Sequence, residues 1–231
     1  MAVDLPTSRR RLVAAMLVLT VATGLIDAVS YLRMGHVFVA NMTGNVVFLG
    51  FALQPDSGLS LLASAVAIGG FLCGAVGGGR IAARLAGRSP TWLRTAFAVQ
   101  AALLVVVAAL GGLGVLAYAG HGALVTIAVL AAGFGLQNAT VRRLAVPDLT
   151  TTVLTLGLTG LAADSRLAGG PGARPHRRLG SVLAMLAGAA AGTLLLLVAT
   201  PTVVIASAAA LVIIATTLLT VTSRVVQAGK R

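Results

Sequence analysis

Long apolar runs separated by short polar gaps dominate this chain. Six of the runs reach the roughly 20 apolar residues that a helix needs to cross the hydrocarbon core of a bilayer. These six runs cover 12–32, 60–80, 95–117, 122–141, 180–200 and 202–222. All seven prolines lie outside them, where the missing amide hydrogen bond costs least. The pattern therefore predicts an all-α integral membrane protein with six transmembrane helices, organised as a single membrane domain over residues 1–231.

Two shorter apolar runs, 37–53 and 149–163, are interrupted by Asn, Thr and Gly. Basic residues indicate whether these runs cross the bilayer, because cytoplasmic loops are enriched in Lys and Arg. If the N-terminus is cytoplasmic and neither short run crosses, 16 of the 17 Lys and Arg residues are cytoplasmic and only Arg33 is outside. If both runs cross, this asymmetry is lost. We therefore expect two re-entrant half-helices, with both termini in the cytoplasm.

The two halves of the chain resemble each other. The motif GLIDA at 24–28 aligns with GLQNA at 135–139, and each lies near the end of a span. Later in each half, small residues recur every four positions, a spacing that lets two helix backbones approach closely. They are Gly70, Gly74, Gly78, Ala184, Gly188 and Gly192. Because each half has three spans, an odd number, the repeats (about 12–117 and 122–223) are expected to be inverted, as in many secondary transporters.

Composition supports the membrane class and excludes several others. Hydrophobic residues make up 58% of the chain, charged residues 10%, and the mean hydropathy is +1.01, whereas soluble proteins carry about 25% charged residues. The net charge of +12 lies in the gaps between runs and at the termini, so it indicates topology rather than a nucleic-acid partner. With Cys73 as the only cysteine, neither an internal disulfide nor a thiolate metal site is expected.

The short runs carry the candidate binding chemistry. Residues 35–41 are expected to be extended, with Asn41 or Thr43 capping a half-helix that ends near Leu53. The chain would enter the second half-helix from the cytoplasmic side, so that two helix N-termini with free N–H groups meet near the midplane. This geometry suits a small polar or anionic solute. The predicted solute-binding residues are Asn41, Thr43, Gly44, Asn45, Asn138, Thr150, Thr151 and Thr152. The alternative is that these groups only cap helices and satisfy one another.

Asp27 is the only acidic residue within a long run. An ionisable side chain at this depth is costly, and it suggests a proton- or cation-coupling role. Thr23, Ser30 and Tyr31 lie at i−4, i+3 and i+4, so a face of the same helix could hydrogen-bond the carboxylate. The alternative is a buried structural strut. Asn138, its counterpart in the second half, cannot titrate and so favours the strut.

Four motifs together resemble a known family. GLIDAVSYL at 24–32, HVFVANMTGN at 36–45, GLQNA at 135–139 and DLTTT at 148–152 are similar to motifs of the YoaK-like family of bacterial multi-pass membrane proteins, classed as domain of unknown function 1275. The resemblance covers nearly the whole chain. It implies a bacterial inner-membrane location, and it supplies no established activity and no catalytic residues.

The sequence therefore predicts a transporter or channel for a small solute or ion, with its site between the two half-helix N-termini. The alternative is a non-transporting membrane protein that interacts or regulates through the Arg-rich loop 164–178. An enzyme is not expected, because paired carboxylates, a nucleophile turn and a phosphate loop are all missing from the sequence. No cofactor or metal is expected. A thin wall of six spans suggests a homodimer formed through the glycine-rich faces.

Overall fold

The computed structural model describes residues 8–85, 89–144, 154–170 and 175–220. Within these ranges the chain contains helices and no strand. The helices are α1 (Arg9–Arg33), α2 (Met42–Phe51), α3 (Leu61–Arg84), α4 (Ser89–Gly112), α5 (Ala123–Leu144), α6 (Leu154–Ala163), the 3₁₀-helix η1 (Arg166–Ala168), α7 (Pro175–Val198) and α8 (Pro201–Thr220). Among them, α1, α3, α4, α5, α7 and α8 are long and apolar enough to cross a membrane. The expectation of a multi-pass helical membrane protein is confirmed.

The helix boundaries follow the sequence pattern closely. The first short helix, α2, begins directly after Asn41, one of the two predicted cap positions, and ends two residues before Leu53. The largest differences are at α4, which begins at Ser89 rather than near residue 95 and ends at Gly112 rather than near residue 117. Gly114 has a φ of 73°, which takes the backbone out of the right-handed helical region. Apolar residues 113–117 therefore belong to a turn between two spans.

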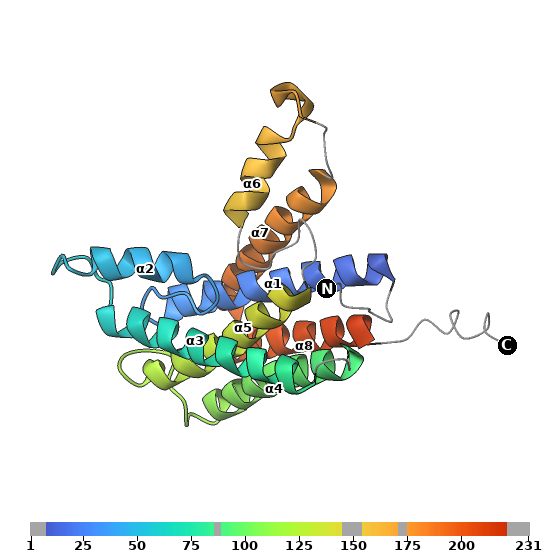
Figure 1. The fold of residues 1–231 in the computed structure, drawn as a ribbon. Helices are drawn as coiled ribbons and strands as arrows, with labels where there is room; N and C mark the ends of the chain where they lie inside the picture. Colours follow the sequence, from blue (N-terminus) through green and yellow to red (C-terminus); the bar gives the residue numbers. More distant parts are fainter. Residues whose placement is uncertain (1–7, 86–88, 145–153, 171–174, 221–231) are drawn as a thin grey trace.

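Helices α1 and α5 form the centre of the bundle (Figure 1). Of the most apolar stretch of each helix, 67% is buried in α1 and 61% in α5, compared with 22% in α3 and 28% in α7. The outward faces of these two peripheral helices carry large apolar side chains such as Leu72 and Leu186, which are 58% and 63% exposed. A soluble protein could not keep so much apolar surface in water, whereas lipid covers it without cost.

Close backbone contacts define how the spans run. A Cβ atom added at Gly70 would lie 2.6 Å from the carbonyl oxygen of Ala128, and one added at Gly78 would lie 3.0 Å from that of Leu136. Residue numbers increase together along this contact, so α3 and α5 run in the same direction. The predicted close approach of glycine-bearing helices is confirmed here. The face of α3 that carries Gly70, Gly74 and Gly78 therefore packs against α5 within the chain and is not free for a dimer contact. The homodimer itself stays a prediction.

The contact between α1 and α7 has the same character. A Cβ atom added at Gly188 would collide with the carbonyl oxygen of Val21, and one at Gly192 would lie 2.8 Å from that of Leu25. These two helices therefore also run in the same direction. Further along, α6 packs against α7 and not against the central helices, and Figure 1 shows α6 and the first part of α7 standing away from the rest of the bundle.

Candidate functional site

The loop between α1 and α2 turns back into the bundle. Gly35 and His36, directly after α1, have φ angles of 90° and 56°, and two consecutive residues in the left-handed region reverse the chain. The His36 amide donates to the carbonyl oxygen of Tyr31 at 3.2 Å. The following residues return to the level of Asp27, which lies six residues before the end of α1, or about 9 Å below it. The beginning of α2 is thus held inside the bundle.

The Asp27 carboxylate holds this loop. Its Oδ1 accepts hydrogen bonds from the backbone N–H groups of Val39 at 3.0 Å and Ala40 at 2.9 Å, and its Oδ2 accepts one from the side-chain amide of Asn41. The Asp27 side chain is only 5% exposed. An extended segment has no internal partners for its N–H groups, so inside a membrane it needs acceptors of this kind.

The predicted hydrogen-bond partners of Asp27 are therefore wrong. The Thr23 hydroxyl donates to the carbonyl oxygen of Leu19 at 2.9 Å, and the Ser30 hydroxyl donates to the backbone oxygen of Asp27 rather than to its carboxylate. Serine and threonine in a helix reach the carbonyl group of the preceding turn easily. The ring of Tyr31 stacks instead on that of Phe38, with centroids 5.2 Å apart.

Asn45 fixes the same loop from the side of α2. Its Oδ1 accepts from the N–H of Phe38 at 2.9 Å, and its Nδ2 donates to the carbonyl oxygen of Phe38 at 2.5 Å. Asn45 is fully buried. Gly44 leaves space for the ring of Phe38, because a Cβ there would lie 2.6 Å from the ring. Thr43, by contrast, has an exposed side chain. Three of the four predicted binding residues in this half thus build the loop.

The N-terminus of α2 already has an anion beside it. Asn41 is the N-cap residue, yet its side chain does not cap the helix and instead contacts the Asp27 carboxylate. A carboxylate near a helix N-terminus is stabilised by the partial positive charge of the helix dipole. The position expected to receive an anionic solute therefore lies against the chain's own carboxylate.

The other predicted residues are in the second half. Thr150, Thr151 and Thr152 lie outside the described residues, directly before α6. Asn138, on α5, donates from Nδ2 to the carbonyl oxygen of Phe134 at 2.9 Å and is partly buried.

A second polar group lies deeper, and the sequence reasoning missed it. Nε2 of Gln100, on α4, donates to Oε1 of Gln137, on α5, at 2.7 Å. Nε2 of Gln137 donates in turn to Oγ1 of Thr23, on α1, at 3.1 Å. All three side chains are 0% exposed. The available signal was Gln100, the one amide in the run 95–117, and Gln137, which lies beside Asn138 in the run 122–141, since polar residues within spans are generally functional or tightly paired.

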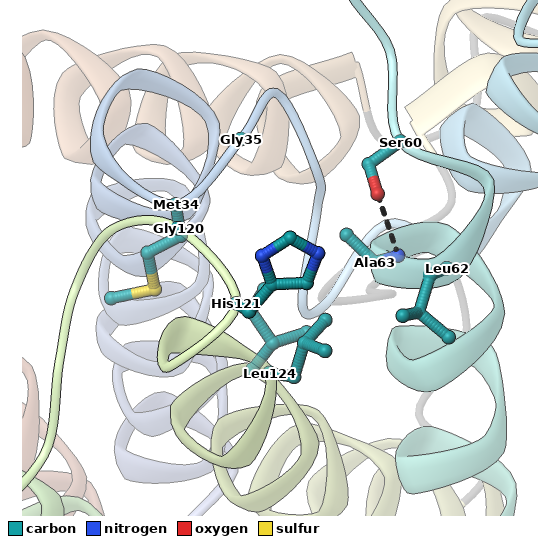
Figure 2. A pocket seen from close by; sticks show the side chains of 9 residues that line it. Met34, Gly35, Ser60, Leu62, Ala63, Gly120, His121 and Leu124 are labelled. Carbon is teal, nitrogen blue, oxygen red and sulfur yellow. Dashed lines mark hydrogen bonds between the residues drawn. The ribbon is translucent and has the colours of Figure 1, made fainter.

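A pocket of about 240 Å³ opens where α1 ends and where α3 and α5 begin. Figure 2 shows the His121 imidazole among Met34, Ser60 and Leu124 in this pocket. The Ser60 hydroxyl accepts the N–H of Ala63 at 3.1 Å and caps α3. Because residues from these three helix ends line one pocket, the end of α1 and the beginnings of α3 and α5 lie at the same end of the bundle.

No three His, Cys, Asp or Glu side chains are grouped as a metal site would require, within the described part of the chain.

Comparison with known proteins gives one family and one curated relative. The family model described as "Protein of unknown function (DUF1275)" matches residues 15–218. The UPF0700 transmembrane protein YoaK of Bacillus subtilis (strain 168) is 32% identical over 151 residues, which cover 63% of this chain. The alignment spans 64% of that relative's length, slightly less than two thirds. No solved structure matches the chain.

Proposed function

The chain belongs to the DUF1275 family of proteins of unknown function, and we propose that it moves a small solute or ion across the membrane between two inverted halves. Family membership confirms the resemblance recognised from the motifs, and the protein is a multi-pass membrane protein. A bacterial inner-membrane location with both termini in the cytoplasm is part of the proposal.

One observation carries it, namely that the chain makes the same helix interface twice. Gly74 packs against the backbone of Ala132, and Gly188 packs against that of Val21. Adding 114 to a residue number in α3 gives its counterpart in α7, and adding 111 to one in α1 gives its counterpart in α5. By the same rule, Leu25 and Leu136 are equivalent, and they face the equivalent residues Gly192 and Gly78.

A further pair of contacts in this interface obeys the same two offsets. A Cβ at Gly24 would meet Met185 and Ala189, and one at Gly135 would meet Phe71 and Ala75. The other helix contacts are also repeated between the two halves. The contact of α1 with α8 corresponds to that of α5 with α4, and the contact of α2 with α3 corresponds to that of α6 with α7. Such agreement supports two structural repeats.

The directions of the helices support inversion. Since the end of α1 and the beginning of α5 line one pocket, these equivalent helices point in opposite directions. A pair of repeats related in this way is typical of secondary transporters, which alternate between two states by moving one repeat against the other. In addition, α2 and α6 have 10 residues each, about 15 Å, which is half of a hydrocarbon core of about 30 Å. Their length supports re-entrant half-helices.

A second candidate function has an observation in its favour. The polar side chains of Asp27, Asn41 and Asn45 all form hydrogen bonds within or to the loop between α1 and α2. This arrangement is expected if their role is to hold the loop and not to bind a solute. Polar groups that are occupied in this way fit a non-transporting interaction or regulatory protein, whose function would be carried by the Arg-rich segment 164–178.

Flux measurements on purified protein in proteoliposomes separate the two. We expect currents on a solid-supported membrane for at least one solute in a panel of monovalent cations, halides, amino acids and sugars. Empty liposomes provide the background. Labelling of single cysteines introduced at 40–46 and 149–155, after removal of Cys73, gives a second measurement. Background currents for the whole panel together with unlabelled cysteines would contradict transport.

A further inference from the structure

The side-chain oxygen of Gln100 is the one buried side-chain polar atom without a hydrogen-bond partner in the described part of the chain. Gln100 is 0% exposed and lies near the middle of α4. An unpaired acceptor at such a place is energetically costly, because its hydration has been lost and no hydrogen bond replaces it. Buried polar groups in native proteins are nearly always paired, so an exception calls for a ligand, an ion or water.

The hydrogen bonds around Gln100 all point the same way. Gln100 donates to Gln137, Gln137 donates to Thr23, and Thr23 donates to the carbonyl oxygen of Leu19. Groups in a hydrogen-bonded chain polarise one another. Each donation moves electron density towards the beginning of the chain. The Gln100 oxygen, at this beginning, is therefore a stronger acceptor than an isolated amide oxygen.

The charges nearby favour a positive ligand. Asp27 is the only buried side chain among the described residues that can carry a charge, and it lies one helical turn from Thr23. The positive end of α2 is already beside this carboxylate. The interior thus presents acceptor oxygens and one acid, without a buried cation to attract an anion.

There is also room for one methyl-sized group beside Cγ of Gln100, in the aliphatic part of its side chain. A Cβ atom added at Gly133, on α5, would lie 3.7 Å from Cγ of Gln100 and 3.9 Å from Cδ1 of Leu103. These are ordinary contact distances, so a methyl-sized group fits there without displacing a neighbour. Gly133 is one turn before Gln137, which places this space next to the hydrogen-bonded chain.

We propose that Oε1 of Gln100 is part of a buried binding site for a small monovalent cation, with ammonium, sodium and potassium as the chemical candidates. As a statement about the transported substrate it rests on the proposed transport function, and it differs from the sequence-based expectation of a small polar or anionic solute. As a statement about binding it stands on the Gln100, Gln137 and Thr23 geometry alone.

Thermal unfolding of the detergent-purified protein tests binding without a transport assay. The single tryptophan, Trp92, is buried on α4 two turns before Gln100 and gives an intrinsic fluorescence signal. Ammonium, sodium and potassium chloride are compared with N-methyl-D-glucamine chloride at equal concentration. We expect at least one cation to raise the unfolding temperature by roughly 3–6 °C at ten times its dissociation constant.

Two variants make the test specific. Gln100→Leu removes the acceptor and keeps the side-chain volume, but it also leaves Oε1 of Gln137 without its donor and should lower the unfolding temperature in every salt. The variant is therefore compared with itself across the four salts, and it should lose the cation effect. Thr140→Val is the matched control. Thr140, on α5, is as fully buried as Gln100, but its hydroxyl donates to the carbonyl oxygen of Leu136 and takes no part in the hydrogen-bonded chain of Gln100. This control should keep the effect. Equal unfolding temperatures in all four salts, as expected for a bound water, or a shift that persists in Gln100→Leu, would overturn the proposal.

The same protein in proteoliposomes distinguishes this inference from the proposed function. If a cation raises the unfolding temperature but no flux is measured, the binding site is supported and the transport function is not. If flux is measured but no cation raises the unfolding temperature, transport is supported and the cation-site proposal is overturned.

Discussion

The carboxylate of Asp27 accepts a hydrogen bond from the side-chain amide of Asn41, 14 residues further along the chain. This bond joins the interior of α1 to the residue that precedes α2. Asp27 is therefore part of the structure that holds α2 in place. Its geometry as a hydrogen-bond acceptor and its charge can be tested independently.

Replacement of Asp27 by Ala is expected to destabilise the protein by at least about 3 kcal/mol. It leaves the N–H groups of Val39 and Ala40 and the amide of Asn41 without acceptors, at about 1–3 kcal/mol each. Replacement by Asn should cost much less, because its oxygen can accept from the loop and the Asn41 amide can rotate to accept from its NH₂ group. Thermal unfolding in detergent measures both variants.

If Asp27 also couples transport to a cation, Asp27→Asn should abolish flux while it preserves the fold. Unchanged flux in this variant would leave only the structural role. A stable Asp27→Ala protein would contradict the arrangement of the loop itself.

Alanine at Gly74 or Gly188 is expected to lower stability by similar amounts, about 1–3 kcal/mol each. In both positions the added Cβ collides with a carbonyl oxygen of the neighbouring span. Gly77→Ala is the matched control on α3, since a Cβ there meets nothing within 4 Å. The unfolding temperature of the three variants checks this. A cost at only one of the two glycines would argue against equivalent interfaces.

A reporter fused after residue 55 is expected to be outside the cytoplasm, whereas reporters at either terminus and in the segment 164–170 should be inside. The physical reason is that a 10-residue helix is too short to cross, so the chain leaves each half-helix on the side where it entered. Alkaline phosphatase and green fluorescent protein fusions give the two readouts. A reporter after residue 55 on the same side as the N-terminus would remove the re-entrant interpretation.

Cys73 provides a direct test of a homodimer. It is exposed on α3, on a stripe with Gly69 and Gly77, where added Cβ atoms meet nothing within 4 Å. Small residues four positions apart favour close helix pairing in membranes. If two copies pair through this stripe, mild oxidation in native membranes should give a disulfide-linked dimer, and Cys73→Ala should prevent it. A chain that stays monomeric under these conditions would exclude this interface.

Some features of the site could be predicted and others could not. The beginning of α2 could be limited to Asn41 or Thr43, because extended chain followed by a polar residue and an apolar run is a local pattern. The structure has Asn41 in this position, without the predicted capping hydrogen bond. The partner of Asp27 was predicted wrongly, because helical spacing considers only residues of the same helix, whereas the actual donors come from a loop that turns back at Gly35 and His36. Gln100 went unnoticed because a single amide is uninformative until its neighbour Gln137, 37 residues away, is known.

The sequence by itself determined the membrane class, the six spans, the position of the short helices and the similarity of the two halves. These properties follow from local hydropathy and from spacing along one helix, since bilayer thickness and helix geometry act on each segment separately. Only the tertiary structure decided that α1 lies against α7 and α5 against α3, that Asp27 holds the returning loop, and that the oxygen of Gln100 is left without a partner. Those outcomes depend on which groups of distant segments come within contact or hydrogen-bonding distance of one another. Because the membrane interior offers no water as an alternative partner, helix packing decides which of these groups are paired.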